Sequence, residues 1–116
     1  MDNKQLPIID WELGIKLAGG KKELATEILD VFISTLAQEM IDFQQLEKEK
    51  NYTELLRRVH KFHGGVAYLG LPRIKTLAAN LESDLKSNIM SNLPSQLTQL
   101  NIEVNLLLEH FSLLPS

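Results

Sequence analysis

The chain carries two histidines followed by two glycines in the run His-Lys-Phe-His-Gly-Gly, which occupies positions 60 to 65. An imidazole has an unperturbed pKa of about 6.5, so near neutral pH it offers a nitrogen lone pair. Histidines at this spacing can serve as a nucleophile toward an acyl phosphate or as a pair of metal ligands. The chain has no cysteine, which excludes disulfides, thiolate metal sites and cysteine nucleophiles.

The element that must position these residues is a predicted amphipathic helix. Its apolar residues recur at spacings of four and three and form one stripe: Leu55, Val59, Phe62, Val66 and Leu69. At about 100° per residue, His60 lies roughly 140° from the centre of that stripe and faces outward. Gly64 follows one turn later and points the same way. A glycine inside a helix costs about 1 kcal/mol relative to alanine, so Gly64 and Gly65 together indicate that the imidazole needs room beside it.

Local signals place the ends of this helix and of the helices after it. Asn51 and Glu54 have the spacing of a capping box, which predicts a helix start near residue 52. Gly70 suits the C′ position at the end of the helix. Each of the two following helices has a proline in its first turn. Their expected bounds are Pro72 to about Asn88 and Pro94 to about Phe111.

Two more helical patterns precede the histidine helix. Asp10 suits the N-cap of a short helix from Trp11 to about Ala18, and the two glycines that follow it end that helix. A long pattern without glycine or proline runs from Lys21 to about Lys50. Its predicted inward residues are Leu24, Ile28, Val31, Phe32, Leu36, Met40, Phe43 and Leu46.

These patterns predict an all-α fold with no β-hairpin signal. Four amphipathic helices with short connections indicate an antiparallel, up-down four-helix bundle, with the short helix as an extra N-terminal element. We expect one domain over residues 1–116, with residues 1–8 as a loose lead-in. A chain of 116 residues can bury roughly 65% of its unfolded surface in a single core. Because one chain supplies all four helices, we expect a monomer.

Composition narrows the classes of partner. The net charge is −3, and acidic and basic residues are interspersed. A nucleic-acid binder would show a basic stripe, so we expect no nucleic-acid partner. No run of 18 apolar residues exists, so we expect no membrane contact by this domain. We expect a cytoplasmic location.

The residues around His60 resemble a known signature. His60, Phe62 and Gly64, then Gly70 six residues later, then Leu81-Glu82, are similar to the motif of histidine-containing phosphotransfer (HPt) domains. The resemblance covers essentially the whole chain. The stretch around His60 and the run from residue 68 to 73 are most similar to the C-terminal HPt domains of BarA/GacS-type hybrid sensor kinases. One departure is His63, where most of the family has lysine.

The resemblance implies a phosphoryl carrier in a two-component multistep phosphorelay. His60 would accept a phosphoryl group from a receiver-domain aspartate and pass it to the receiver aspartate of a response regulator. The chain has no Walker motif or phosphate-cradling glycine loop, so it is not expected to be a kinase by itself. We expect no cofactor of its own, since magnesium would be held by the partner receiver domain.

The resemblance and the helical geometry assign roles to the neighbours of His60. His63 would stabilise the phosphoryl group in place of the usual lysine, and this requires its protonated form, which a phosphoryl dianion favours. Gly64 would provide steric access. Glu82 would accept a hydrogen bond from the ring nitrogen that is not phosphorylated and so orient the ring.

A second group of residues is predicted to bind the partner. Arg57, Lys61 and Arg73 lie close to this face in sequence and either steer an acidic receiver pocket toward His60 or are ordinary solvated charges. Leu56 and Ala67 flank His60 at helical spacing and would supply an apolar docking patch.

Two other classes of function stay open at this point. His60 and His63 at i, i+3 could chelate a metal ion, but no histidine here has a glutamate three residues before it, so a third ligand would have to be another carboxylate. The other class is a helical interaction module whose glycines only permit close packing. That function requires Gly64 to face a neighbouring helix, whereas the apolar stripe turns it outward.

Overall fold

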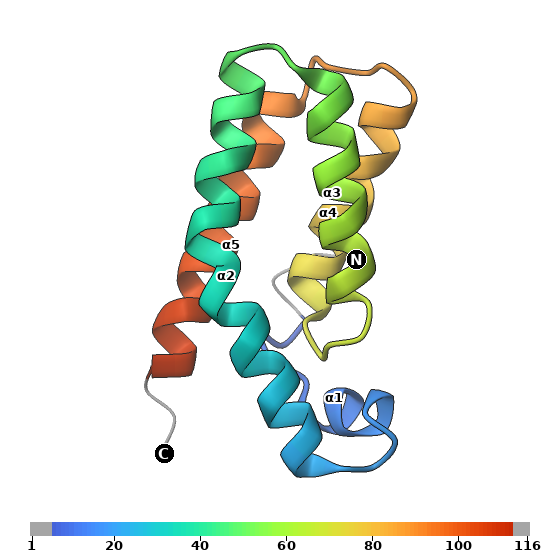
Figure 1. The fold of residues 1–116 in the computed structure, drawn as a ribbon, viewed down its shortest axis with the longest axis vertical. Helices are drawn as coiled ribbons and strands as arrows, with labels where there is room; N and C mark the ends of the chain where they lie inside the picture. Colours follow the sequence, from blue (N-terminus) through green and yellow to red (C-terminus); the bar gives the residue numbers. More distant parts are fainter. Residues whose placement is uncertain (1–5, 113–116) are drawn as a thin grey trace.

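The computed structural model describes residues 6–112, which form five helices and no strand. Figure 1 shows four of them side by side as an antiparallel bundle, with α1 lying across the lower end. Each bundle helix packs against the next, and α5 closes back on α2. The predicted all-α bundle with a short extra N-terminal helix is confirmed, and residues 1–5 of the predicted lead-in lie outside the described range. The helices are α1 Trp11–Leu17, α2 Lys22–Lys48, α3 Tyr52–Val66, α4 Pro72–Lys86 and α5 Leu93–Ser112.

The helix starts that the sequence predicts are present. The Asp10 side chain accepts a hydrogen bond from the Leu13 N–H at 3.0 Å and caps α1. The Asn51 side chain accepts one from the Glu54 N–H at 3.3 Å and caps α3. Pro72 occupies the first turn of α4, where its missing N–H costs nothing. These two caps and the proline mark where α1, α3 and α4 begin.

The core lies between α2, α3, α4 and α5. Phe62 of α3 packs against α2, with ring centroids 5.5 Å from both Phe32 and Phe43. Such aromatic pairs add to the free energy of burial. The largest fully buried side chains are Phe43, Leu36, Leu55, Leu71, Leu81, Leu100, Leu107, Val59, Val66 and Val104. Four of the five residues of the predicted α3 stripe lie in α3 and are buried, and the fifth, Leu69, is buried just beyond it.

The predicted inward face of α2 is wrong over its first turns. Leu24, Ile28 and Val31 are exposed, Val31 to 67%, whereas Ala25 and Leu29 are buried. The reason is that α2 continues beyond the lower end of the bundle, where it meets α1 (Figure 1). The apolar partner in that region lies on a different side of α2 from the bundle core, so the buried face changes along the helix.

The prediction that Gly70 is the C′ residue of α3 is also wrong. α3 ends at Val66 with Ala67 as its C-cap, and Gly70 lies in the α3–α4 connection. The Asp10 N–H donates a hydrogen bond to the Gly70 carbonyl oxygen at 2.7 Å. A Cβ atom at Gly70 would lie 2.0 Å from the Asp10 carbonyl oxygen and 2.8 Å from the Gly14 nitrogen. Gly70 is therefore required for close approach of the backbone at the start of α1.

Candidate functional site

His60 lies on the outer face of α3, as the periodicity predicts. Its side chain is 70% exposed. The ring Nδ1 lies 2.5 Å from Oε2 of Glu82, which α4 presents alongside α3. Glu82 thus holds Nδ1, while the His60 side chain as a whole stays accessible to solvent and to partners.

Glu82 is the buried centre of this site. Its side chain is only 7% exposed, although it lies on α4 beside the core residue Leu81. Oε2 contacts His60 Nδ1, and it also accepts from Lys86 Nζ at 3.0 Å. Oε1 contacts His63 Nδ1 at 2.7 Å. Three nitrogen donors from α3 and α4 therefore converge on one carboxylate.

The ionisation of Glu82 follows from these contacts. Burial raises the pKa of Glu82, but the three donors outweigh burial and lower the pKa from its ordinary value of 4.5 to about 2. The carboxylate is therefore ionised at neutral pH and can only accept hydrogen bonds. It follows that His60 and His63 each carry a hydrogen on Nδ1 in this arrangement, and in the neutral form of either ring Nε2 is the nitrogen with the lone pair.

The lowered pKa of Glu82 predicts a particular pH dependence of stability. Since the folded state binds this proton more weakly than the unfolded chain, Glu82 stabilises the fold above about pH 4.5 and loses this contribution as the pH falls toward 2. Glu82→Gln should be less stable than wild type by roughly 2 kcal/mol at neutral pH, with the gap closing in acid. Urea unfolding of both proteins between neutral pH and about pH 2 measures the gap. A gap that does not change with pH would contradict the assignment.

Gly64 and Gly65 lie in the last turn of α3 and are both exposed. A Cβ atom built on either glycine would meet nothing within 4 Å. Gly64 therefore does not face a neighbouring helix. An interaction module whose glycines only permit close packing would require that it did. The space it leaves open lies one helical turn from His60.

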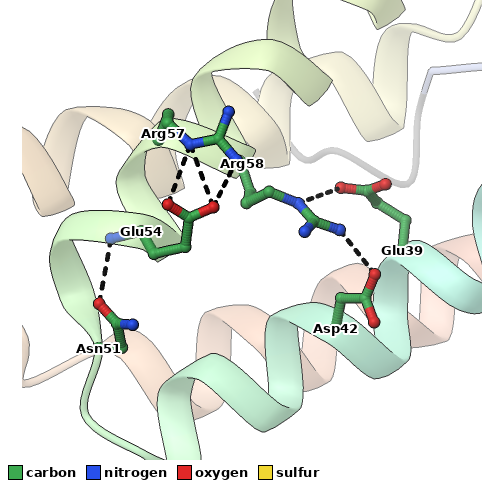
Figure 2. Close-up of polar contacts among 6 residues, drawn as sticks. All are labelled: Glu39, Asp42, Asn51, Glu54, Arg57 and Arg58. Carbon is green, nitrogen blue, oxygen red and sulfur yellow. Dashed lines mark hydrogen bonds and ion pairs between the residues drawn. The ribbon is translucent and has the colours of Figure 1, made fainter.

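The predicted docking residues on α3 lie around His60. Figure 2 shows Arg57 turned back to Glu54 on its own helix, while the neighbouring Arg58 reaches across to Glu39 and Asp42 of α2. Lys61 is exposed and lines a shallow depression between α3 and α2.

The two apolar docking candidates are only partly buried. Leu56 packs against the edge of the core, and Ala67 lines a depression together with residues of α1 and α4. These positions leave both side chains accessible beside His60. Their part in docking, like that of Arg57 and Lys61, stays a prediction.

Arg73 does not lie where the sequence placed it. Its side chain is only 11% exposed, and its guanidinium donates to Glu103 of α5 at 2.6 Å. Glu103 is itself buried among core residues. The pair joins α4 to α5 inside the bundle, so Arg73 is not available to steer a partner toward His60.

Sequence reasoning missed two charged residues that matter here. Lys86 joins the Glu82 cluster, and its position four residues after Glu82 is the signal that could have found it, because such pairs meet on a helix. Glu103 pairs with Arg73, and its place within the apolar stripe of α5, three residues after Leu100, marks it as buried.

The residues that the structure describes also bear on metal binding and on membrane insertion. Within residues 6–112, no group of three or more histidine, aspartate or glutamate side chains is arranged to hold a metal ion. The two histidines of the site instead share a single carboxylate. No helix within the same range is long and apolar enough to cross a membrane.

Comparison with known proteins gives a consistent result. A family model described as Hpt domain matches residues 27–110. Sensor histidine kinase GacS of Pseudomonas protegens is 28% identical over 79 residues, which are 68% of this chain and 9% of that protein. Signal transduction histidine-protein kinase BarA of Escherichia coli is 31% identical over 74 residues, which are 64% of this chain and 8% of that protein. The chain thus spans less than a tenth of the length of these relatives.

A solved structure extends the similarity to the fold. The crystal structure of the HPT domain from a sensor hybrid histidine kinase of Shewanella superposes with a TM-score of 0.76 and 25% sequence identity. The match covers 99% of this chain and 100% of that domain. The similarity therefore includes α1 as well as the four-helix bundle.

Proposed function

The chain belongs to the Hpt domain family, whose members act in histidine phosphotransfer in two-component signalling, and we propose that His60 is the residue that carries the phosphoryl group. One observation carries the proposal: His60 is exposed, and its Nδ1 is held by the ionised Glu82. In the neutral ring, that contact makes Nε2 the nitrogen with the lone pair. Hpt domains are phosphocarriers rather than catalysts, so the site needs little beyond such a nucleophile.

The transfer step follows from this tautomer. The Nε2 lone pair of His60 attacks the phosphorus of an aspartyl phosphate on a receiver domain. The bond between phosphorus and the carboxyl oxygen breaks, and the aspartate leaves as a carboxylate with the electron pair. The hydrogen on Nδ1 stays in place, so the phosphorylated ring carries a positive charge that faces Glu82. The attack requires no proton transfer.

The same contact serves the onward transfer. A receiver aspartate attacks the phosphorus, and Nε2 leaves with the electron pair of the N–P bond. Because Nδ1 remains protonated and hydrogen-bonded to Glu82, the leaving ring is a neutral imidazole and not an anion. Glu82 thus acts as a positioning residue in both directions, since it holds the ring orientation and the tautomer.

The partners in this proposal are receiver domains of a hybrid kinase and of a response regulator. Magnesium bound by the receiver would supply charge neutralisation at the phosphoryl group. Gly64 would leave space for the receiver, while Arg57 and Lys61, which line the depression between α3 and α2, would present positive charge to its acidic pocket. We further propose that the domain works as a monomer in the cytoplasm, free or joined to a sensor kinase.

A transfer experiment tests the assignment of His60. A receiver domain carrying radiolabelled phosphate is mixed with wild type, His60→Gln or His110→Gln. His110 is the matched control, because it is an exposed histidine at the far end of α5. We expect acid-labile label on wild type and on His110→Gln, and none on His60→Gln. Label that persists on His60→Gln would contradict the assignment and move the acceptor to His63 or His110.

A further inference from the structure

We propose that Lys86 is the cation that neutralises the phosphoryl group on His60. When His60 is phosphorylated, the Lys86 ammonium moves from the Glu82 carboxylate to the phosphoryl oxygens. The inference rests on the proposed function, and it gives a role to Lys86, for which the sequence suggested none. It also bears on His63, which the sequence predicts as the phosphoryl-stabilising residue.

The geometry brings Lys86 and His60 to one atom. Oε2 of Glu82 lies 2.5 Å from His60 Nδ1 and 3.0 Å from Lys86 Nζ. Lys86 is the last residue of α4, and its side chain is 59% exposed. Only the lysine end of this ion pair is exposed, since the Glu82 carboxylate is buried. The lysine stem is flexible, so the ammonium can reach a nearby phosphoryl group once another cation faces the carboxylate.

Phosphorylation itself supplies the reason for Lys86 to move. Before transfer, the carboxylate of Glu82 has Lys86 as its cation. After transfer, the His60 ring is positively charged and its Nδ1–H donates to the same oxygen, which makes that hydrogen bond charge-assisted and stronger. The positively charged ring thus becomes a cation for the carboxylate. At the same time the phosphoryl group, which carries nearly two negative charges, requires a cation of its own. The two changes favour the same exchange of partners.

The other lysines and arginines near the site do not contact the Glu82 carboxylate. Arg57 is paired with Glu54. Arg58 is paired with two carboxylates of α2, and Arg73 is buried in its pair with α5. Lys61 lines the depression on the α2 side of α3. Of the lysines and arginines in residues 6–112, Lys86 is the one that shares a carboxylate oxygen with His60.

His63 is better placed to hold Glu82 than to follow the phosphoryl group. Its Nδ1 contacts Oε1, the oxygen that His60 does not use. That contact remains when Lys86 leaves Oε2, so the buried carboxylate keeps a donor on each oxygen. In this division, His63 fixes the carboxylate and Lys86 supplies the mobile charge.

Phosphorus NMR tests the inference directly. Wild type, Lys86→Gln, His63→Gln and Lys75→Gln are phosphorylated with phosphoramidate, and the phosphohistidine signal is followed as a function of pH. A cation beside the phosphoryl group lowers its second pKa, so Lys86→Gln should raise that pKa by about half a pH unit. Lys75→Gln is the matched control, because Lys75 is an exposed lysine on the same helix. It should leave the titration unchanged.

Equilibrium transfer gives a second measurement. With a phosphorylated receiver, Lys86→Gln should hold about three- to fivefold less phosphoryl group than wild type, as expected for the loss of one exposed charge pair. An unchanged phosphorus titration in Lys86→Gln, or the shift appearing in His63→Gln instead, overturns the inference while the proposed function stands. Absence of any phosphohistidine signal from wild type overturns the proposed function, and the inference with it.

Discussion

Replacing Gly64 with glutamine is expected to block phosphoryl transfer between His60 and a receiver domain while the domain stays folded. A side chain at Gly64 meets no neighbour within 4 Å, so it projects into the space one turn from His60. The receiver aspartate must approach Nε2 through that space. Displacement of a reacting group by about 1 Å can slow a positioned reaction by about a hundredfold. We expect a loss of at least that size in the transfer rate.

The Gly64→Gln variant should be more stable than wild type, although its transfer rate falls. Glutamine is a better helix former than glycine, by up to about 1 kcal/mol, and the site has room for it. Rapid-quench transfer assays and urea unfolding measure the two effects on one preparation. Phosphoramidate serves as the control, because a small donor should still reach His60 in Gly64→Gln. Undiminished transfer from the receiver, or a large loss of stability, would contradict the role of Gly64 in access.

Replacing Gly70 with alanine should have the reverse pattern, with a large loss of stability. The added methyl group would lie 2.0 Å from the Asp10 carbonyl oxygen, a backbone atom that cannot move alone. Relief requires α1 to move away, which breaks the hydrogen bond from the Asp10 N–H to the Gly70 carbonyl oxygen. Overpacking of this kind costs about 1 to 3 kcal/mol, and we expect a value at the upper end.

The single tryptophan makes this prediction easy to follow. Trp11 is the first residue of α1 and packs against the core. Its fluorescence should therefore report displacement of α1 in Gly70→Ala at low urea, and the unfolding midpoint should fall. Gly64→Ala is the matched control, since the same substitution at an open helical position should raise stability. An unchanged midpoint in Gly70→Ala would contradict the close contact.

Together, these two variants separate two glycines that belong to one sequence motif. Gly64 leaves space outside the molecule, one helical turn from His60. Gly70 leaves space inside it, where α1 crosses the α3–α4 connection. A resemblance in sequence shows both glycines without distinguishing them, and the distance from an added Cβ atom to its nearest neighbours is what separates their roles.

The sequence alone determined the features that depend on near neighbours in the chain. The caps at Asp10 and Asn51 each join residues three positions apart, so spacing is enough to find them. The outward position of His60 follows from the helical period in the same way. The family motif then predicted His60 as the phosphoacceptor and Glu82 as the residue that orients its ring, and the structure places the two side chains in contact.

Only the tertiary structure decided which distant groups meet. The contact from His60 to Glu82 spans 22 positions in the chain, and the pair of Arg73 with Glu103 spans 30. Such contacts depend on how far one helix is shifted along the next and on which helix covers which face. The same reason explains the misplaced inward face of α2, since no local pattern states where the bundle ends. The carboxylate that His60, His63 and Lys86 share, with its lowered pKa, exists because α3 and α4 pack in this register.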